Sequence, residues 1–274
     1  VKRVEIHTTV ENDVKDHRLR VHFPAPFMVA EAYQDGHFEV VNRVVGVPEM
    51  GEDWMEAPRP EVPQRAFTDI SNGELGLMVA NRGLPEVEVL NRPSVKNSEI
   101  ALTLLRCVGW LSRGDLPLRQ GHAGPAMETP GAQMLGRWTF EYAIFPHSGG
   151  WLEATQDAYA YQTPLRAMET GLHEGTYPGQ GAFITHSPEE WVITAVKPAD
   201  KGKGWILRGV NITDESLQVR VEPLAQYSNA TRVNLAEEVE SRLDTQADGA
   251  VAFEVTGHQV TSVLFQDKQD EDND

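Results

Sequence analysis

The sequence predicts a mainly β protein in which a large β-sandwich is followed by a small one. Apolar and polar residues alternate with a period of two along much of the chain, as in strands with one buried face. The 23 glycines and 17 prolines divide the chain into short segments, and segments with helical periodicity are few. With 274 residues, 40% of them hydrophobic, the chain can form one large or two ordinary cores.

Four segments show the alternation most clearly, in chain order. They are VKRVEIHTTVEN at 1–12, RWTFEYAIFPH at 137–147, LQVRVEPL at 217–224 and VAFEVTGHQVTSVLFQ at 251–266. The last segment predicts two strands around a turn near Gly257.

Two further segments carry helical signals. SPEEWVITAVKP opens like a helix at Ser187 and Pro188, but its β-branched run from Trp191 to Val196 favours a strand. NLAEEVES, at 234–241, fits either one or two helical turns or a polar strand at a sheet edge.

A domain boundary is expected near THSPEEW, at 185–191. Residues 1–187 are predicted to form the large sandwich, with long strands and elaborate loops. Residues 188–266 are predicted to form the small sandwich, because short strands recur there at a spacing of about ten residues. Residues 267–274 are expected to be a disordered acidic tail.

Composition limits the classes of partner. A formal net charge of −17 argues against nucleic acid, since neutralising phosphates requires a basic face. No apolar run approaches the roughly 20 residues that span a bilayer, and no signal peptide opens the chain. The single cysteine, Cys107, lies in a strand pattern and is expected to be buried. We therefore expect a cytoplasmic protein, and a start at Val1 without methionine indicates a segment of a longer one.

Several other candidates for chemistry are weak. His17 and His22 are five residues apart, so a strand would place them on opposite faces and they would not share a metal. A glycosidase pair would need two facing carboxylates roughly 5–10 Å apart. The available carboxylates are Asp69, Glu86, Glu88 and Glu141. The sequence does not show any two of them facing each other across a site, although Glu86 and Glu88 share a strand face.

The strongest candidate is the polar stretch from Ala101 to Gly136, which begins as a strand and continues as a glycine-rich loop. Arg113 and Arg119 flank Asp115 there, and His122 follows. Guanidinium groups suit hydroxyls, carboxylates or phosphates, and glycines let a ligand approach the backbone. The alternative, an arginine that pairs with Asp115 to hold the loop, is equally open.

Several motifs together resemble the carboxy-terminal region of glycoside hydrolase family 38 α-mannosidases, in particular the bacterial and archaeal branch. They are spread from about residue 16 to residue 265 and include DHRLRVHFP, GHFEVV, FTDISNGELGLMVANRGLPEVEV, IALTLLRCVGWLSRGDL, HAGPAMETPGAQMLG, FEYAIFPH, GWILRGVNIT and NLAEEVE.

The resemblance implies a large β-supersandwich similar to galactose mutarotase and a small immunoglobulin-like β-sandwich. It implies that zinc, an aspartate nucleophile and a carboxylic acid belong to an amino-terminal catalytic domain with a retaining mechanism. That domain and an α-mannoside are the expected partners. This segment is expected to hold no catalytic residue and no metal ligand, and to be inactive alone.

Relatives donate a loop arginine to the sugar site, so the resemblance implies substrate-binding residues in the glycine-rich loop. Arg113 is the first choice, followed by Arg106, Asp115, Arg119 and His122. Arg106 is the weakest by position, since a strand residue can equally be a covered member of an ion pair. Mannosylated glycans, mannosylglycerate and its phosphorylated form all remain open as substrates.

The alternative function is a free-standing carbohydrate-binding or mutarotase-like β-sandwich. Six tryptophans and six tyrosines could supply faces on which sugars stack. Trp138 and Trp191, however, lie in strand patterns and are expected in the cores.

Overall fold

A computed structural model describes residues 2–175, 178–200 and 204–266. Strands make up 48% of it and helix 6%, which confirms the mainly β class. The chain forms two compact units, one of residues 2–37 and 41–165, the other of residues 38–40 and 166–266. The division thus falls before the strand Ile184–Ser187, whereas the sequence placed the boundary after it. The predicted acidic tail lies outside the described residues.

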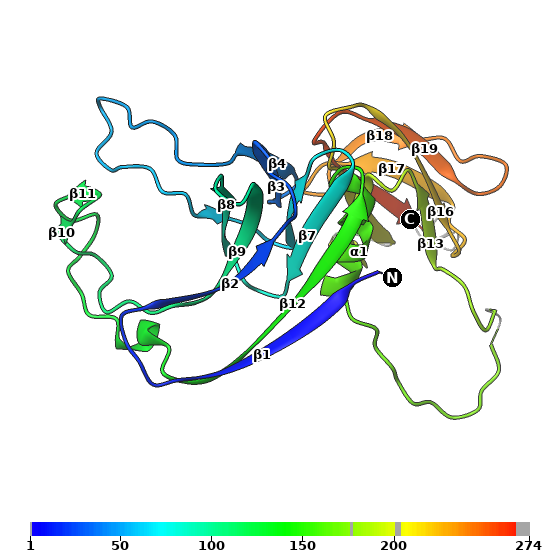
Figure 1. Ribbon diagram of the computed structural model, residues 1–274. Helices are drawn as coiled ribbons and strands as arrows, with labels where there is room; N and C mark the ends of the chain where they lie inside the picture. The colour runs from blue at the N-terminus through cyan, green and yellow to red at the C-terminus, as the bar shows by residue number, and fades with distance from the viewer. Residues whose placement is uncertain (1, 176–177, 201–203, 267–274) are drawn as a thin grey trace. The chain divides into compact units, whose positions relative to one another are not determined.

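The first unit contains a six-stranded sheet in the order β1-β12-β7-β6-β3-β4. Figure 1 shows its first two strands side by side; they pair antiparallel from Val4↔Ile144 to Asn12↔Gly136. Both strands come from segments in which the alternation predicted strands. The six strands are β1 (Val4–Asn12), β3 (Glu31–Asp35), β4 (Val40–Val44), β6 (Phe67–Ser71), β7 (Leu75–Asn81) and β12 (Gly136–Ser148).

A four-stranded sheet faces this one, in the order β2-β9-β8-β5. Its strands are β2 (Arg18–Pro24), β5 (Val62–Pro63), β8 (Glu86–Arg92) and β9 (Asn97–Arg106). One hydrophobic cluster takes side chains from both sheets, including Ile70, Val79 and Tyr142 from the first and Val87 and Leu102 from the second. The first unit is therefore a β-sandwich.

The helix α1 (Leu152–Gln162) covers the other face of the six-stranded sheet against β7 and β12. Its buried side chains include Ala154, Ala158 and Tyr161, and the Tyr161 ring meets Phe145 edge to face at 6.4 Å. The Arg82 guanidinium donates to the Tyr161 carbonyl at 2.7 Å. Because both faces of the sheet are covered, four of the five residues of β6 are buried.

Two loops project from one end of this sandwich, at the left of Figure 1. The longer loop carries the short strands β10 (Asp115–Leu116) and β11 (Arg119–Gln120) and the 3₁₀ helix η1 (Pro130–Gln133). The other runs from the end of β4 to β5. They are joined where the Ala57 amide donates to the Leu118 carbonyl at 2.8 Å. This connection joins the loop between β4 and β5 to the glycine-rich loop that carries the candidate residues.

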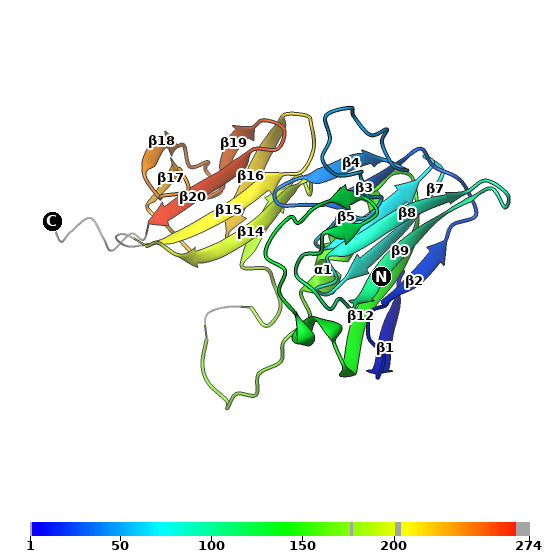
Figure 2. The ribbon, with the colours of Figure 1, turned by 90° about the vertical axis from the view of Figure 1, so that its left-hand side faces the viewer.

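The second unit is a smaller sandwich, coloured from yellow-green to red in Figure 2. A five-stranded sheet, β14-β15-β20-β17-β18, faces a three-stranded sheet, β13-β16-β19, across one core. The strands are β13 (Ile184–Ser187), β14 (Trp191–Pro198), β15 (Trp205–Asn211), β16 (Leu217–Pro223), β17 (Asn229–Val233), β18 (Val239–Leu243), β19 (Val251–Val255) and β20 (Val260–Gln266).

The second unit contains several segments whose structure the sequence predicted. The β-branched run after Ser187 is strand β14, and Trp191 is fully buried against Phe253 as expected. The sequence left open whether the acidic segment 234–241 would form helical turns or a polar edge strand; its last three residues lie in the edge strand β18, and none of the segment is helical. The two strands around Gly257 are also confirmed, although β19 and β20 belong to different sheets.

In the first unit, the prediction for Cys107 is confirmed and the prediction for Trp138 is not. Cys107 is buried, as predicted, directly after β9. Trp138 was expected in the core, but its side chain is exposed, so that prediction was wrong. The reason is that its indole Nε1 donates to the Met134 carbonyl at 2.7 Å, which holds the ring over the loop instead of the core.

Candidate functional site

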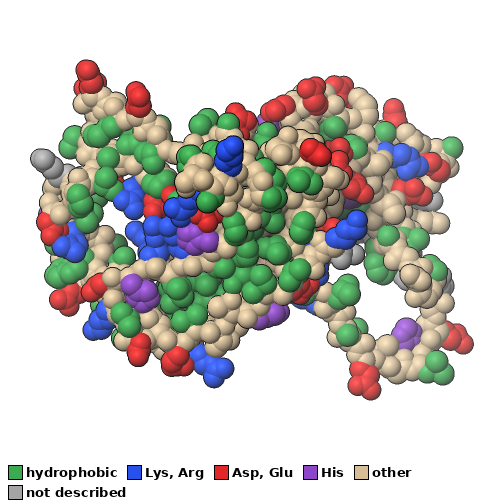
Figure 3. All heavy atoms as spheres, in the orientation of Figure 1, with side chains coloured by type: hydrophobic (Ala, Val, Ile, Leu, Met, Phe, Trp, Pro, Cys, Tyr) green, Lys and Arg blue, Asp and Glu red, His purple; other side chains and the backbone are tan. Residues whose placement is uncertain are grey.

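A groove of about 480 Å³ opens where β9 ends and the glycine-rich loop begins. In Figure 3 basic side chains gather in the hollow beside the projecting loops. Two of the predicted residues, Arg106 and Arg113, line the groove together with Trp110, Leu111 and Leu116. The latter three have exposed side chains, so the groove combines guanidinium donors with an apolar wall.

Arg113 is held by Asp115 through two hydrogen bonds. Its Nε donates to Oδ1 at 2.9 Å and its Nη2 to Oδ2 at 2.5 Å. Both side chains are exposed. The hydrogen bond and the nearby charge raise the pKa of Arg113 and lower the pKa of Asp115. The sequence left open that an arginine pairs with Asp115 to hold the loop, and Arg113 forms that pair. Arg113 is also the residue that was the first choice for binding substrate.

His122 lies in a second hollow beside the groove, lined also by Trp110, Arg113 and Asp115. Its Nδ1 is 3.4 Å from the Ser112 hydroxyl, which in turn accepts the backbone amides of residues 123 and 124. A Cβ on Gly114 would lie 2.8 Å from the imidazole Nε2, so a larger residue there would require the exposed ring of His122 to shift. The structure therefore brings His122, Arg113 and Asp115 together at this hollow.

Arg119 lines neither hollow. Its Nη1 donates to the Glu56 carboxylate at 3.1 Å, and the two residues also form a backbone bridge between the two projecting loops. Arg119 thus links the glycine-rich loop to the loop between β4 and β5.

Arg106, the weakest candidate by sequence position, has the least engaged guanidinium in the groove. Its side chain is 67% exposed, and its ion pair with Glu86 is long, with 3.9 Å between Nε and Oε2. Glu86 also accepts the Thr103 hydroxyl at 2.7 Å and lies 3.6 Å from Arg18. Arg106 therefore has a looser ion pair than Arg113, whose guanidinium makes two hydrogen bonds to Asp115.

Glu86 belongs to a chain of alternating charges on the sheet face opposite the core. Arg18 also pairs with Glu61, which accepts two further hydrogen bonds from Arg59 at 3.1 and 3.2 Å. Burial opposes ionisation of Glu61, but the hydrogen bonds from Arg18 and Arg59 outweigh it and lower its pKa to about 2. The chain therefore runs from Arg59 in one loop to Arg106 at the groove.

Sequence reasoning missed three residues of the site. Trp110 is an exposed tryptophan in a glycine-rich loop, a placement that could have marked it as a binding residue. Asp16 lines the groove from the turn before β2, and its Oδ1 accepts the Gln133 amide at 2.7 Å. Glu86 was considered only as half of a carboxylate pair. Neither the contact of Asp16 with Gln133 nor the contact of Glu86 with Arg106 could be predicted from neighbouring residues, because each joins segments that are distant in sequence.

The four candidate carboxylates each have a basic partner instead of a second carboxylate. Glu86 and Glu88 share a strand face as predicted, and Glu88 pairs with Arg20. Glu141 accepts from Arg82 at 2.6 Å. Asp69 is fully buried and accepts from His147 at 2.6 Å; burial raises the pKa of Asp69, although this hydrogen bond opposes the shift.

No group of three or more His, Cys, Asp or Glu side chains suited to a metal is found among the described residues. These residues therefore do not fit a zinc site, and no step is assigned to a metal in this chain. Within the same ranges, no helix has the length and apolar character that a membrane crossing requires.

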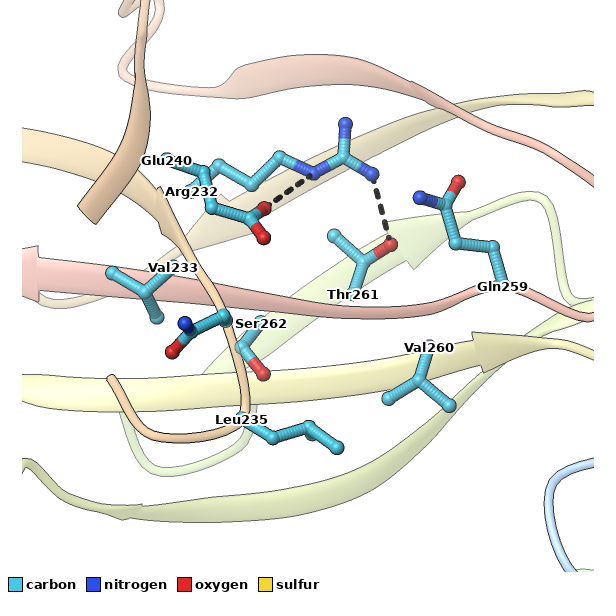
Figure 4. A pocket seen from close by; sticks show the side chains of 9 residues that line it. Arg232, Val233, Leu235, Glu240, Gln259, Val260, Thr261 and Ser262 are labelled. Atoms are coloured by element: carbon cyan, nitrogen blue, oxygen red, sulfur yellow. Dashed lines mark hydrogen bonds and ion pairs between the residues drawn. The ribbon is translucent and has the colours of Figure 1, made fainter. Parts of the chain in front are cut away.

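The second unit has a smaller hollow of about 190 Å³ (Figure 4). Arg232 lies over it, with Nη2 donating to the Thr261 hydroxyl at 3.3 Å and Nε 3.8 Å from Glu240. Leu235, Val260 and Gln259 are among its other lining residues. None of its lining residues is aromatic, so this hollow lacks the face on which a sugar ring would stack.

Comparisons with known proteins agree on one family. Residues 190–263 match the Glycosyl hydrolases family 38 C-terminal beta sandwich domain. The chain is 30% identical to a protein named "Putative mannosylglycerate hydrolase" in Halalkalibacterium halodurans over 267 residues, which are 97% of this chain and 27% of that protein.

Two solved structures from Enterococcus faecalis are similar over 97% of this chain and 28% of theirs. One is an alpha-mannosidase from strain V583, at 28% identity and a TM-score of 0.77. The other is a protein in the Glycosyl Hydrolase Family 38, at 27% identity and a TM-score of 0.75. The chain spans little more than a quarter of the length of these relatives. The resemblance seen in the sequence is confirmed, and the chain belongs with the carboxy-terminal β-sandwich regions of glycoside hydrolase family 38.

Proposed function

We propose that this chain is the non-catalytic carboxy-terminal part of an α-mannosidase, where it packs on a catalytic domain and lends its glycine-rich loop to the mannoside site. One observation carries the proposal: 97% of the chain superposes on a region that is only 28% of an alpha-mannosidase. Its groove, with donors and an apolar wall at a loop, has the character expected at the rim of a sugar site.

The proposed division of labour follows from the side chains present. The catalytic domain would supply a zinc ion, an aspartate nucleophile and a carboxylic acid for a retaining cleavage. This chain would supply hydrogen-bond donors from Arg106 and Arg113, and Trp110 as a face for the apolar side of the sugar. Asp115 and His122 would position the loop beside the substrate, and Arg119 would brace it. These five polar residues and Trp110 act by binding and orientation alone.

The free-standing sugar-binding protein remains the alternative, and no observation favours it. Reading the gene upstream of Val1 separates the two functions. An open reading frame in the same frame, encoding an α/β domain, supports the proposed function. A start codon close to Val1 contradicts it.

The enzymatic test compares the chain alone with the full-length protein. Release of chromophore from an aryl α-mannoside, with zinc added, should occur with the full-length protein and not with the chain alone. Turnover by the chain that disappears when one of its own residues is substituted would contradict a non-catalytic role.

A further inference from the structure

The two sheets of the first unit have four edge strands, and three of these carry features that hinder pairing with a further strand. Unpaired N–H and C=O groups at a sheet edge readily bind another strand, so exposed edges are usually short, interrupted, or marked by proline or charge. β5 has two residues and ends at Pro63, and β4 has five. The pairing of β2 with β9 shifts register between Leu19 and Arg20, and β2 ends at Pro24.

The fourth edge strand, β1, carries none of these features. It runs for nine residues, from Val4 to Asn12, without proline, lysine or arginine. All nine pair with β12 in an unbroken register, and within the described ranges no other strand pairs with β1. Figure 1 shows β1 along the lower border of its sheet. The second edge of β1 therefore presents a long, uninterrupted row of backbone donors and acceptors.

The two carboxylates of β1 would not repel a neighbouring strand, because each has a basic residue beside it. Glu5 accepts from the Arg3 guanidinium at 2.6 Å. Glu11 lies opposite Arg137 in the register with β12. A neighbouring strand would thus meet little uncompensated charge along this edge.

The side of β1 that faces the sandwich core is only partly covered. Ile6 and Val10 pack against the core cluster but are only partly buried, and Val4 is 55% exposed. The three side chains point to the same side, because alternate residues of a strand share a face. A strand with alternating apolar residues could pair with the free edge and cover these side chains at the same time.

The rest of the parent polypeptide is the most accessible source of such a strand. This chain covers only 27% of one relative and 28% of an alpha-mannosidase structure, so most of their length lies outside the matched region. A segment of the same polypeptide has an effective concentration of about millimolar, far above that of a second copy. Covering the edge from within one molecule also prevents association between copies through their edges.

We infer that β1 is an internal strand of a wider sheet, and that its free edge binds a strand of the same polypeptide from outside residues 1–274, with alternating apolar residues turned to the sandwich core. This inference rests on the proposed function, because both require the chain to be part of a longer protein. It adds a second interface, distant in sequence from the glycine-rich loop, at which the first unit shares one hydrogen-bonded sheet with the remainder of the protein.

Hydrogen–deuterium exchange of the full-length protein, read at single residues, tests the pairing. Adjacent residues of an antiparallel pair direct their N–H groups alternately towards the partner and away from it. One of the neighbouring amides of Thr8 and Thr9 therefore points away from β12. Both amides should exchange at least about a hundredfold slower than in an unstructured peptide if a strand lies on each side of β1. The reference is the polar edge strand β18, in which every second amide should exchange fast.

Photocrosslinking in the full-length protein identifies the occupant. The exposed residue Glu11 is replaced by p-benzoylphenylalanine, which a paired strand would approach to about 5 Å. It should cross-link, within one molecule, to a peptide outside residues 1–274. The matched control places the same group at the exposed Ser241 of β18, where it should not label that peptide.

Four results would overturn the inference. They are exchange at either amide as fast as at the outward amides of β18, labelling from position 11 of a second copy only, labelling of residues 1–274 only, and no labelling. Hydrolysis of an aryl α-mannoside by the same sample reports separately on the proposed function. Hydrolysis together with a fast amide in β1 overturns this inference alone, whereas slow amides and the expected cross-link without hydrolysis overturn the proposed function alone.

Discussion

Arg113 and Asp115 face each other across Gly114 and form two hydrogen bonds on an exposed hairpin, at 2.9 and 2.5 Å. The pair allows two roles for the arginine to be separated by experiment. In the full-length enzyme, Arg113→Ala should lower kcat/KM for an α-mannoside by about tenfold, because it removes charged donors from the groove. Asp115→Asn leaves those donors in place and should lower kcat/KM by less than Arg113→Ala does.

The melting temperature is the second readout for this pair. Neither substitution should change it appreciably, since both side chains are exposed and lie outside the core. Equal losses of activity in both variants would mean that the pair only holds the hairpin. A melting temperature that falls in parallel with activity would mean the same.

The strands of this fold could be predicted from the sequence because their apolar positions alternate. The partners of those strands could not, since β1 pairs with β12, more than a hundred residues away. The helix α1 was also missed. Its buried face is made of Ala154, Ala158 and Tyr161 among polar residues, so it carries no strong apolar stripe.

Several of the candidate residues line neighbouring hollows, but the contacts that distinguish Arg106 from Arg113 could not be predicted from the sequence. For Arg106 the sequence left open a substrate-binding role and a covered position in an ion pair. Arg106 is exposed because β9 ends there and Glu86, its partner across the sheet, is shared with Arg18 and Thr103. Predicting that outcome requires the strand pairing, which local periodicity does not give.

A substitution of Gly76 is predicted to destabilise the fold, because the buried pair of His147 and Asp69 lies next to it. A Cβ at Gly76 would lie 1.9 Å from His147 Cε1, so the imidazole would have to leave its hydrogen bond with Asp69. Leaving a buried charged group without its partner costs about 2–3 kcal/mol. Gly76→Ala should therefore lower the free energy of unfolding by about that amount, measured by urea titration.

Gly150→Ala is the control for that measurement, because Gly150 is exposed and an added Cβ there meets nothing within 4 Å. Its unfolding curve should overlay the wild-type curve. Equal stability of the Gly76 variant and the wild type would show that His147 can move without loss.

The low pKa of Glu61 predicts that part of the protein's stability is lost in acid. Its folded pKa is about 2 against a usual value of 4.5, so its ionised form stabilises the fold at neutral pH. A depressed acidic pKa gives stability that is present above pH 4.5 and is lost as the pH falls from there towards 2. The wild type should therefore be more stable than Glu61→Gln at pH 6, and this difference should shrink below pH 4.5.

Thermal unfolding of the two proteins between pH 6 and pH 2.5 measures that difference directly. The other carboxylates and the net charge of −17 affect both proteins alike, so the comparison isolates Glu61. Parallel curves over the whole range would contradict the assignment of Arg18 and Arg59 as the groups that lower its pKa.

Arg119 and Glu56 link the two projecting loops. Arg119 donates to Glu56 at 3.1 Å, and beside it the Ala57 amide donates to the Leu118 carbonyl at 2.8 Å. If the side-chain contact holds the loops together, Arg119→Ala should speed hydrogen–deuterium exchange at Ala57 and in the surrounding loop, residues 46–61. Exchange in the core strand β9 should stay slow, because this link carries no core contacts. Arg113→Ala, which removes an arginine from the same loop without touching Glu56, should leave exchange at Ala57 unchanged. Unaltered exchange in Arg119→Ala would show that the backbone bridge alone joins the loops, and acceleration in both variants would show that any change in the hairpin loosens them.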